Sequence, residues 1–200
     1  MTLDKYGTGD DPYCYSDSSV LRNLLNIEDD AELANAEQEI TELAVDGIDF
    51  EPPPYDFGYF KKLHSLIFED VYEWAGKVRT IDMSKGDTRF CTCSRITPET
   101  DKIFQAFAEA DYYQHYDREN FVKAIAELYV ELNMAHPFRE GNGRAQRMLF
   151  EHIIINAGYE FDLESVTQPE WIDANIAGVG CNYEPIITLF SRCIGDTLDT

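Results

Sequence analysis

The segment from His136 to Arg147 brings together the residue types that chemistry on phosphate groups uses. Two glycines flank Asn142 directly before a helical pattern, and such a tight turn points several backbone N–H groups in one direction. The positive end of the following helix dipole strengthens the attraction for an anion. Residues 136–143 therefore predict a phosphate-binding loop, and Pro137 favours an extended conformation at the residue before it.

The charged side chains of this segment suit the same ligand. Arg144 and Arg147 are three residues apart, so they share a face of the first helical turn and can reach two phosphate groups. Glu140 can hold Mg²⁺, because that ion takes one or two carboxylates together with phosphate oxygens. The imidazole of His136, with an ordinary pKa near ~6.5, can accept a proton from an incoming hydroxyl. We expect Phe138 to anchor the loop inward.

Each of these features also has a purely structural interpretation. A histidine before a proline is usually structural, and a Gly-Asn-Gly sequence is usually only a turn. Two arginines on one helix face are usually solvated or paired with carboxylates. The combination of a base, a carboxylate, an anion-binding turn and two arginines within 136–147 nevertheless favours a functional site.

The elements that must position this loop are predicted to be mostly helical. Apolar residues recur at helical spacing in several segments, and capping residues or glycines mark their ends. The predicted helices cover about residues 20–25, 30–44, 57–74, 117–132 and 144–157, and a last one follows 182–185. Three consecutive prolines at 52–54 mark a turn between two of them, since proline disrupts a helix interior.

Residues 78–93 have a different character. Two short stretches, 78–83 and 88–93, flank the turn-like sequence at 84–87, and this pattern is typical of a β-hairpin. No other part of the chain predicts a convincing strand pair. With an irregular lead-in over 1–18, the whole of 1–200 is therefore predicted to form one mostly α domain with a hairpin.

The charge balance excludes some classes of partner. The chain has 38 acidic and 16 basic residues, which gives a net charge of −22. A field of this sign repels nucleic acids and anionic membrane surfaces, so neither is expected as a direct partner. It also repels ATP, so a nucleotide site has to be locally basic, as the two arginines would make it. No apolar run approaches the roughly 20 residues that span a bilayer.

Five cysteines, an odd number without a preceding signal peptide, predict reduced thiols and a cytoplasmic protein. Cys91 and Cys93 form a close pair, but no second pair completes a zinc site. A four-helix metal protein is also disfavoured, because paired Glu-x-x-His ligands are missing from suitable positions.

The segment His136 to Arg147 resembles the signature of the Fic (filamentation induced by cAMP) family. That signature is His-Pro-Phe-x-Asp/Glu-Gly-Asn-Gly-Arg-x-x-Arg, and the chain matches every specified position. The likeness extends to the opening at 6–13, to 20–23 and to Trp74-Ala75-Gly76, which resemble the short stand-alone bacterial Fic toxins. It implies a Fic fold, a helical bundle whose β-hairpin forms a flap beside the active-site loop.

The resemblance implies a role for each residue of the loop. His136 would be the general base, and Glu140 would hold Mg²⁺, with ATP as co-substrate. The turn of Gly141, Asn142 and Gly143 would bind the α-phosphate.

Arg144 and Arg147 would then grip the β- and γ-phosphates, while Asn182 and Tyr183 can line the pocket for the base. The flap would align a segment of the target protein by strand addition. Its docking residues would be Lys85, Gly86, Asp87, Thr88, Arg89 and Phe90.

The same resemblance bears on the transferred group. Fic members that phosphorylate carry lysine where this chain has Gly143, so glycine favours transfer of AMP from ATP to a protein hydroxyl. Transfer of UMP, GMP, phosphocholine or phosphate stays open, because base choice lies outside the motif. An inactive nucleotide-binding interaction module is a further alternative.

Fic enzymes are typically inhibited by a helix with the sequence Ser/Thr-x-x-x-Glu-Gly/Asn. Glutamate precedes Gly or Asn only at Glu140 and Glu119, and His136 and His115 stand four residues earlier. We therefore expect a separate small antitoxin whose glutamate meets Arg147. Among similar toxins the targets are type II topoisomerases, so DNA gyrase or topoisomerase IV subunits are the expected partners.

Overall fold

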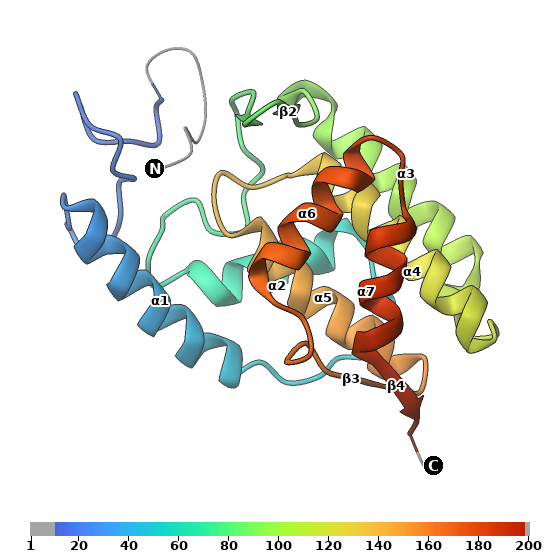
Figure 1. Cartoon of the computed structure of the whole chain (residues 1–200). Helices are drawn as coiled ribbons and strands as arrows, with labels where there is room; N and C mark the ends of the chain where they lie inside the picture. Colours follow the sequence, from blue (N-terminus) through green and yellow to red (C-terminus); the bar gives the residue numbers. More distant parts are fainter. Residues whose placement is uncertain (1–10, 199–200) are drawn as a thin grey trace.

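The computed structural model describes residues 11–198, and helices dominate it (Figure 1). The predicted mostly α fold with one small hairpin beside the loop is confirmed. The helices are α1 (Asp30–Asp46), α2 (Phe57–Phe68), α3 (Ile96–Glu109), α4 (Arg118–Ala135), α5 (Asn142–Asn156), α6 (Gln168–Val179) and α7 (Glu184–Cys193). Short 3₁₀ turns, η1 (Cys93–Arg95) and η2 (Asp111–Tyr113), flank α3. None of the helices within 11–198 has the length and apolar character needed to cross a membrane.

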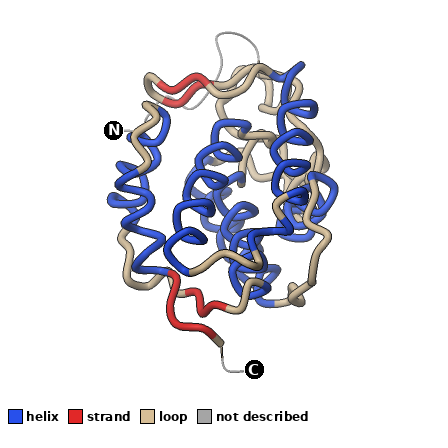
Figure 2. The backbone as a smooth tube through the Cα atoms, turned by 90° about the vertical axis from the view of Figure 1, so that its right-hand side faces the viewer, coloured by secondary structure: helices blue, strands red, loops and turns tan. Residues whose placement is uncertain are grey.

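Two antiparallel pairs of short strands complete the fold. Strands β1 (Ser84–Lys85) and β2 (Thr88–Arg89) form the hairpin, and β3 (Tyr159–Phe161) pairs with β4 (Ile194–Thr197). The two pairs lie at opposite ends of the helices (Figure 2). The pair β3–β4 is an addition to the prediction of a single strand pair. Periodicity also does not delimit α3 and α6.

The helices α4 and α5 form the centre of the core. α4 contacts α3, α5, α6 and α7, while α5 contacts α2, α4 and β3. α4 begins where Asp117 accepts a hydrogen bond from the Asn120 N–H at 2.9 Å, as its sequence predicts for a capped helix. Phe121, Ile125 and Leu132 are fully buried along it. The loop between α4 and α5 therefore starts and ends on two helices of the buried core.

The predicted helix over 20–25 is wrong. Leu21 instead forms an isolated antiparallel bridge with Cys14, and the Leu24 N–H donates to the Val71 carbonyl at 2.8 Å. These backbone groups pair with distant partners, so no local helical ladder forms. The predicted opening motif at 6–13 lies mostly outside the described residues, which begin at 11.

The predicted helix over 57–74 ends early, at Phe68, and a series of turns follows. Trp74 lies in these turns and stacks on Tyr72 with ring centroids 4.4 Å apart. Gly76 adopts φ +72°, and a Cβ there would come within 2.9 Å of the Lys61 carbonyl. The turns let the chain double back on α2, which periodicity cannot reveal.

The hairpin is shorter than predicted. Its strands are two residues each, and Gly86 at φ +55° helps to form the turn between them. The expectation of a strand over 78–83 is wrong, because this stretch pairs with other parts of the molecule. The Arg79 N–H, for example, donates to the Pro137 carbonyl at 2.8 Å.

Candidate active site

His136 lies at the point where α4 ends. Its N–H still donates to the Leu132 carbonyl at 3.2 Å, but its backbone is left-handed, with φ 43° and ψ 61°. The extended conformation expected before Pro137 is therefore wrong. Tertiary contacts override the local preference, since Arg79 donates to the carbonyl oxygens of both His136 (from Nε, 2.8 Å) and Pro137 (from its backbone N–H, 2.8 Å).

The imidazole of His136 has a defined tautomer. Its Nδ1 lies 3.2 Å from the Asn133 carbonyl oxygen, which can only accept, so the proton sits on Nδ1 and Nε2 keeps a lone pair. The ring stacks on Phe90 with centroids 3.8 Å apart and an interplanar angle of 10°. Burial lowers the pKa of His136 to about 3, although the bond to Asn133 and the charge of Glu140 oppose this shift. His136 is thus a neutral base at physiological pH.

The loop after His136 is closed by the side chain of Asn142. Its Oδ1 accepts from the Phe138 N–H at 2.9 Å, and its Nδ2 donates to the Phe138 carbonyl at 2.7 Å. The Phe138 ring is fully buried and stacks on His64 at 3.8 Å. The amide of Asn142 is therefore committed to the loop, and what it can offer an anion is its backbone N–H in the first turn of α5.

His64 supports the loop from below, and its role is not apparent in the sequence. Its Nε2 lies 2.9 Å from the Glu140 carbonyl oxygen, and its Nδ1 accepts from the Gly76 N–H at 2.9 Å. Burial lowers its pKa to about 4, so this neutral tautomer is held firmly. The signal available in the sequence is a polar residue on the apolar face of a predicted helix, beside Leu63 and Ile67.

The two glycines of the turn have different requirements. Gly141 adopts φ +77°, and a Cβ there would lie 2.2 Å from the Phe68 ring. A Cβ on Gly143 would meet no atom within 4 Å, and this residue is exposed in the first turn of α5. Gly141 therefore allows close packing, whereas Gly143 borders open space at the positive end of the helix, where a phosphate group can approach.

The predicted pair of arginines is not equivalent in the structure. Arg144 forms an ion pair with Glu37 on α1, and its guanidinium lies over the Phe68 ring, 4.6 Å from the centroid. Arg147 is exposed. A third arginine, Arg139, is buried and pairs with Asp11 at 2.7 Å. It occupies the unspecified position of the motif, which offers no reason to single it out.

Glu140 lies beside the turn, where the prediction placed a metal ligand. Its Oε1 accepts from the Gly141 N–H at 3.1 Å, and the residue is half-buried. Within residues 11–198 there is no cluster of three or more His, Cys, Asp or Glu side chains that could hold a metal ion. One carboxylate next to an anion-binding turn fits Mg²⁺, which takes its other ligands from phosphate and water.

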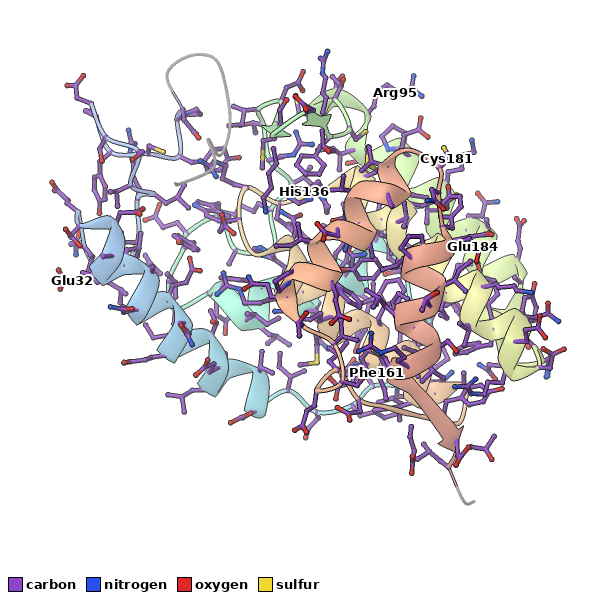
Figure 3. All side chains as sticks on the ribbon, in the orientation of Figure 1. Glu32, Arg95, His136, Phe161, Cys181 and Glu184 are labelled. Carbon is purple, nitrogen blue, oxygen red and sulfur yellow. The ribbon has the colours of Figure 1, made fainter. Side chains whose placement is uncertain are left out.

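A cavity of about 800 Å³ opens next to His136. Its walls come from the end of the hairpin, from α3 and α4, and from the connection between α6 and α7; they include Phe90, Ile103, Glu131, Val179 and Tyr183. Tyr183 thus lines this cavity, and its role in binding the nucleotide base stays a prediction. Asn182 does not line this cavity; it is exposed, and its N–H donates to the Ala177 carbonyl at 3.1 Å. Figure 3 places His136 and Cys181 at the same end of the molecule.

The flap residues divide into two groups. Lys85, Gly86, Asp87 and Arg89 are exposed and Thr88 is half-buried, whereas Phe90 is buried against the imidazole of His136. The tip of the flap therefore faces solvent, and its end forms part of the wall of the cavity beside His136.

Comparisons with known proteins identify the family of this chain. The Fic/DOC family matches residues 54–154. The chain is 33% identical over 193 residues to a protein of Escherichia coli K12 named "Probable protein adenylyltransferase Fic", covering 96% of each. It is 32% identical over 198 residues to the protein adenylyltransferase VbhT of Bartonella schoenbuchensis, covering 95% of this chain and 40% of VbhT.

A solved structure shows the same fold. The N-terminal Fic domain of a VirB-translocated effector from Bartonella quintana, solved with bound ADP, superimposes with a TM-score of 0.86 at 29% identity. The match covers 94% of this chain and 95% of that one. The chain therefore belongs to the Fic/DOC family and, like these relatives, is a protein adenylyltransferase.

Proposed function

We propose that this enzyme transfers AMP from ATP to a hydroxyl side chain of a target protein. The observation that carries the proposal is the neutral His136, whose Nδ1 is bound to the Asn133 carbonyl so that Nε2 keeps its lone pair, and whose neighbours Phe90 and Ala135 line the cavity. Its curated relatives are named as protein adenylyltransferases, and a neighbour of the same fold binds ADP.

In the proposed reaction, Nε2 of His136 takes the proton of the attacking hydroxyl. The hydroxyl oxygen forms a bond to the α-phosphorus, the bond from that phosphorus to the bridging oxygen breaks, and pyrophosphate leaves. The Gly141 N–H is bonded to Glu140, so the N–H groups of Asn142 and Gly143 stabilise the charge that develops on the α-phosphate, and Gly141 shapes the turn. Arg144 and Arg147 bind the outer phosphates, and Glu140 holds the Mg²⁺, which would neutralise phosphate charge when bound.

The base and the transferred group follow from two further features. The cavity beside Tyr183 is the proposed site for adenine, and the glycine at position 143 favours the nucleotide pose of AMP transfer over that of phosphate transfer. Transfer of another nucleotide, of phosphocholine or of phosphate remains an alternative, as does a module that binds nucleotide without transfer.

The flap is proposed to dock the target. Strands of only two residues leave backbone groups at the edge unpaired, and an extended segment of a partner can add to such an edge. The exposed Lys85, Asp87 and Arg89 are placed to select among partners.

Control by a separate antitoxin is part of the proposal. Its support is that Arg147 is exposed and so accessible to a glutamate from another chain. Within this chain, Glu37 pairs with the other arginine of the motif, Arg144. We also propose a type II topoisomerase, DNA gyrase or topoisomerase IV, as the target and the cytoplasm as the compartment. The five free thiols suit that compartment.

Label transfer to lysate proteins tests the reaction. ATP labelled at the α-phosphate should label a protein band in the presence of Mg²⁺, and His136→Ala should abolish the label while nucleotide binding persists. Label from γ-labelled ATP alone would make the enzyme a kinase. No label from either form would favour another nucleotide or the inactive module.

Target and toxicity need a separate measurement. Expression of the wild type in bacteria should slow growth and change plasmid supercoiling, whereas His136→Ala should do neither. Growth arrest with normal plasmid topology would reject the topoisomerase target and leave the transfer reaction standing.

A further inference from the structure

Helix α1 lies outside the matched segment 54–154 but touches the motif directly. Glu37 of α1 forms an ion pair with Arg144, contacting its Nη2. Thr41, one helical turn later, accepts a hydrogen bond from Nη1 at 3.1 Å. Residues four apart share a helix face, so α1 holds both terminal nitrogens of one guanidinium.

Neighbouring side chains enclose most of this contact. The second carboxylate oxygen of Glu37 accepts from the Tyr72 hydroxyl, and the Phe68 ring lies under the Arg144 guanidinium at 4.6 Å. The side chains of Arg144 and Glu37 are 25% and 12% exposed. A charged group held by two acceptors and a ring has lost its rotamer freedom before any ligand binds.

The same arrangement leaves donors for a ligand. A guanidinium has five N–H groups, and Glu37 and Thr41 take one each from the two terminal nitrogens. The Nε–H and one N–H on each terminal nitrogen stay available to an anion. A phosphate group can therefore bind Arg144 without displacing Glu37.

We propose that Glu37 and Thr41 are positioning residues for the nucleotide site, which hold Arg144 ready for the outer phosphates of ATP. This inference rests on the proposed function, in which Arg144 binds those phosphates. The opposite hypothesis is that Glu37 competes with phosphate and acts as an internal inhibitor. Positioning is favoured because both oxygens of Glu37 are already satisfied within the protein and three donors of Arg144 are left.

The test compares binding of a non-hydrolysable ATP analogue and of AMP, both with Mg²⁺, by calorimetry. Glu37→Gln should weaken binding of the analogue about five- to twentyfold, because an ordering charge-assisted bond is lost, and should leave AMP binding within about twofold. Thr41→Val should weaken the analogue less. Glu39→Gln is the matched control, since it removes the same charge from an exposed position of the same helix.

The outcomes distinguish failure of the inference about Glu37 from failure of the proposed function. Equal analogue affinities in Glu37→Gln and Glu39→Gln would overturn the inference while leaving adenylyl transfer intact. Tighter binding in Glu37→Gln would identify Glu37 as an inhibitor and overturn it as well. If the wild type binds the analogue no better than AMP, the outer phosphates are not recognised, and that part of the proposed function fails together with the inference. Thermal melting of each variant shows whether it is folded.

Discussion

The loop over 136–142 carries the imidazole on which Phe90 of the flap over 84–90 stacks, but the two segments are held in opposite ways. In the loop, the Asn142 amide closes the backbone around Phe138, and His64 supports the Glu140 carbonyl from below. In the flap, two strands of two residues each form the pairing, and the tip is exposed.

This difference fits the two roles proposed above, catalysis by the loop and docking of a target by the flap. Acid–base and phosphate chemistry need groups fixed to a fraction of an ångström, and buried hydrogen bonds achieve that. Docking of a partner needs backbone groups that are not already paired, and an exposed edge provides them. Arg79 joins the two regions, since its guanidinium donates to the carbonyls of His136, Ile81 and Cys91.

The largest effect is expected from replacing Arg79, which joins the loop and the flap. In Arg79→Met, three partly buried carbonyls lose their donor, and we expect the free energy of unfolding to fall by about 3 kcal/mol. Transfer should fall more than about a hundredfold, because His136 loses its fixed position. Urea denaturation measures the first effect and label transfer the second.

Arg95→Met is the control for that variant. Arg95 is an exposed arginine just after the flap, and its loss should leave the unfolding free energy nearly unchanged. Equal effects of the two substitutions would mean that Arg79 does not join the regions.

Acidification should weaken the loop side of the comparison. The pKa of His64 is about 4 in the folded protein and near ~6.5 when unfolded. Its stabilising contribution is complete above the unfolded value and is lost as pH falls towards 4, because the unfolded state binds the proton first. In this window each pH unit costs about 1.4 kcal/mol for this residue.

Denaturation of His64→Gln from pH 7 to pH 4 tests that expectation. The variant is less stable at pH 7, but its stability should fall less steeply with acid than that of the wild type. His115→Gln, at an exposed histidine, should keep the wild-type slope. An unchanged slope in His64→Gln would show that His64 is not held neutral.

The contact between the flap and the imidazole of His136 can be tested at Phe90. Phe90→Ala removes the ring stacked on His136 at 3.8 Å and admits water to the imidazole. The pKa of His136 should then rise from about 3 towards its ordinary value. The rate of transfer should drop about tenfold, and activity should fall with acid below about pH 6.5. The wild type should keep its activity to pH 5; identical pH profiles would contradict this role of the flap.

The smallest effect is expected at the tip of the flap. Gly86→Ala has room for its Cβ but keeps a left-handed backbone, at a cost of about 1 kcal/mol. Transfer to protein targets should fall about fivefold, the change in rate that corresponds to that cost, with nucleotide binding unchanged.

Gly158→Ala imposes the same kind of strain at φ +85°, near β3 and away from the flap. It should leave transfer unaltered. An equal loss of transfer in this variant would mean that the effect at Gly86 is not specific to docking.

Much of the site could be predicted because the interactions that shape it join residues close together in the sequence. The turn at 141–143, the helix after it and the Asp117 cap of α4 involve groups within a few residues of one another, where backbone preference and spacing decide the structure. The extent of the hairpin was not predicted, since Arg79, within the β-like stretch at 78–83, gives its backbone N–H to the Pro137 carbonyl of the active-site loop.

The motif, its position between two helices and the mostly helical fold can all be predicted from the order of the residues. The groups that hold the motif in place follow from how the helices pack. The supports His64, Arg79 and Glu37 stand 76, 57 and 107 positions from the residues they contact in it. Partners so far apart meet through packing of whole helices, and periodicity reports only which face of a helix is buried, not what that face will touch.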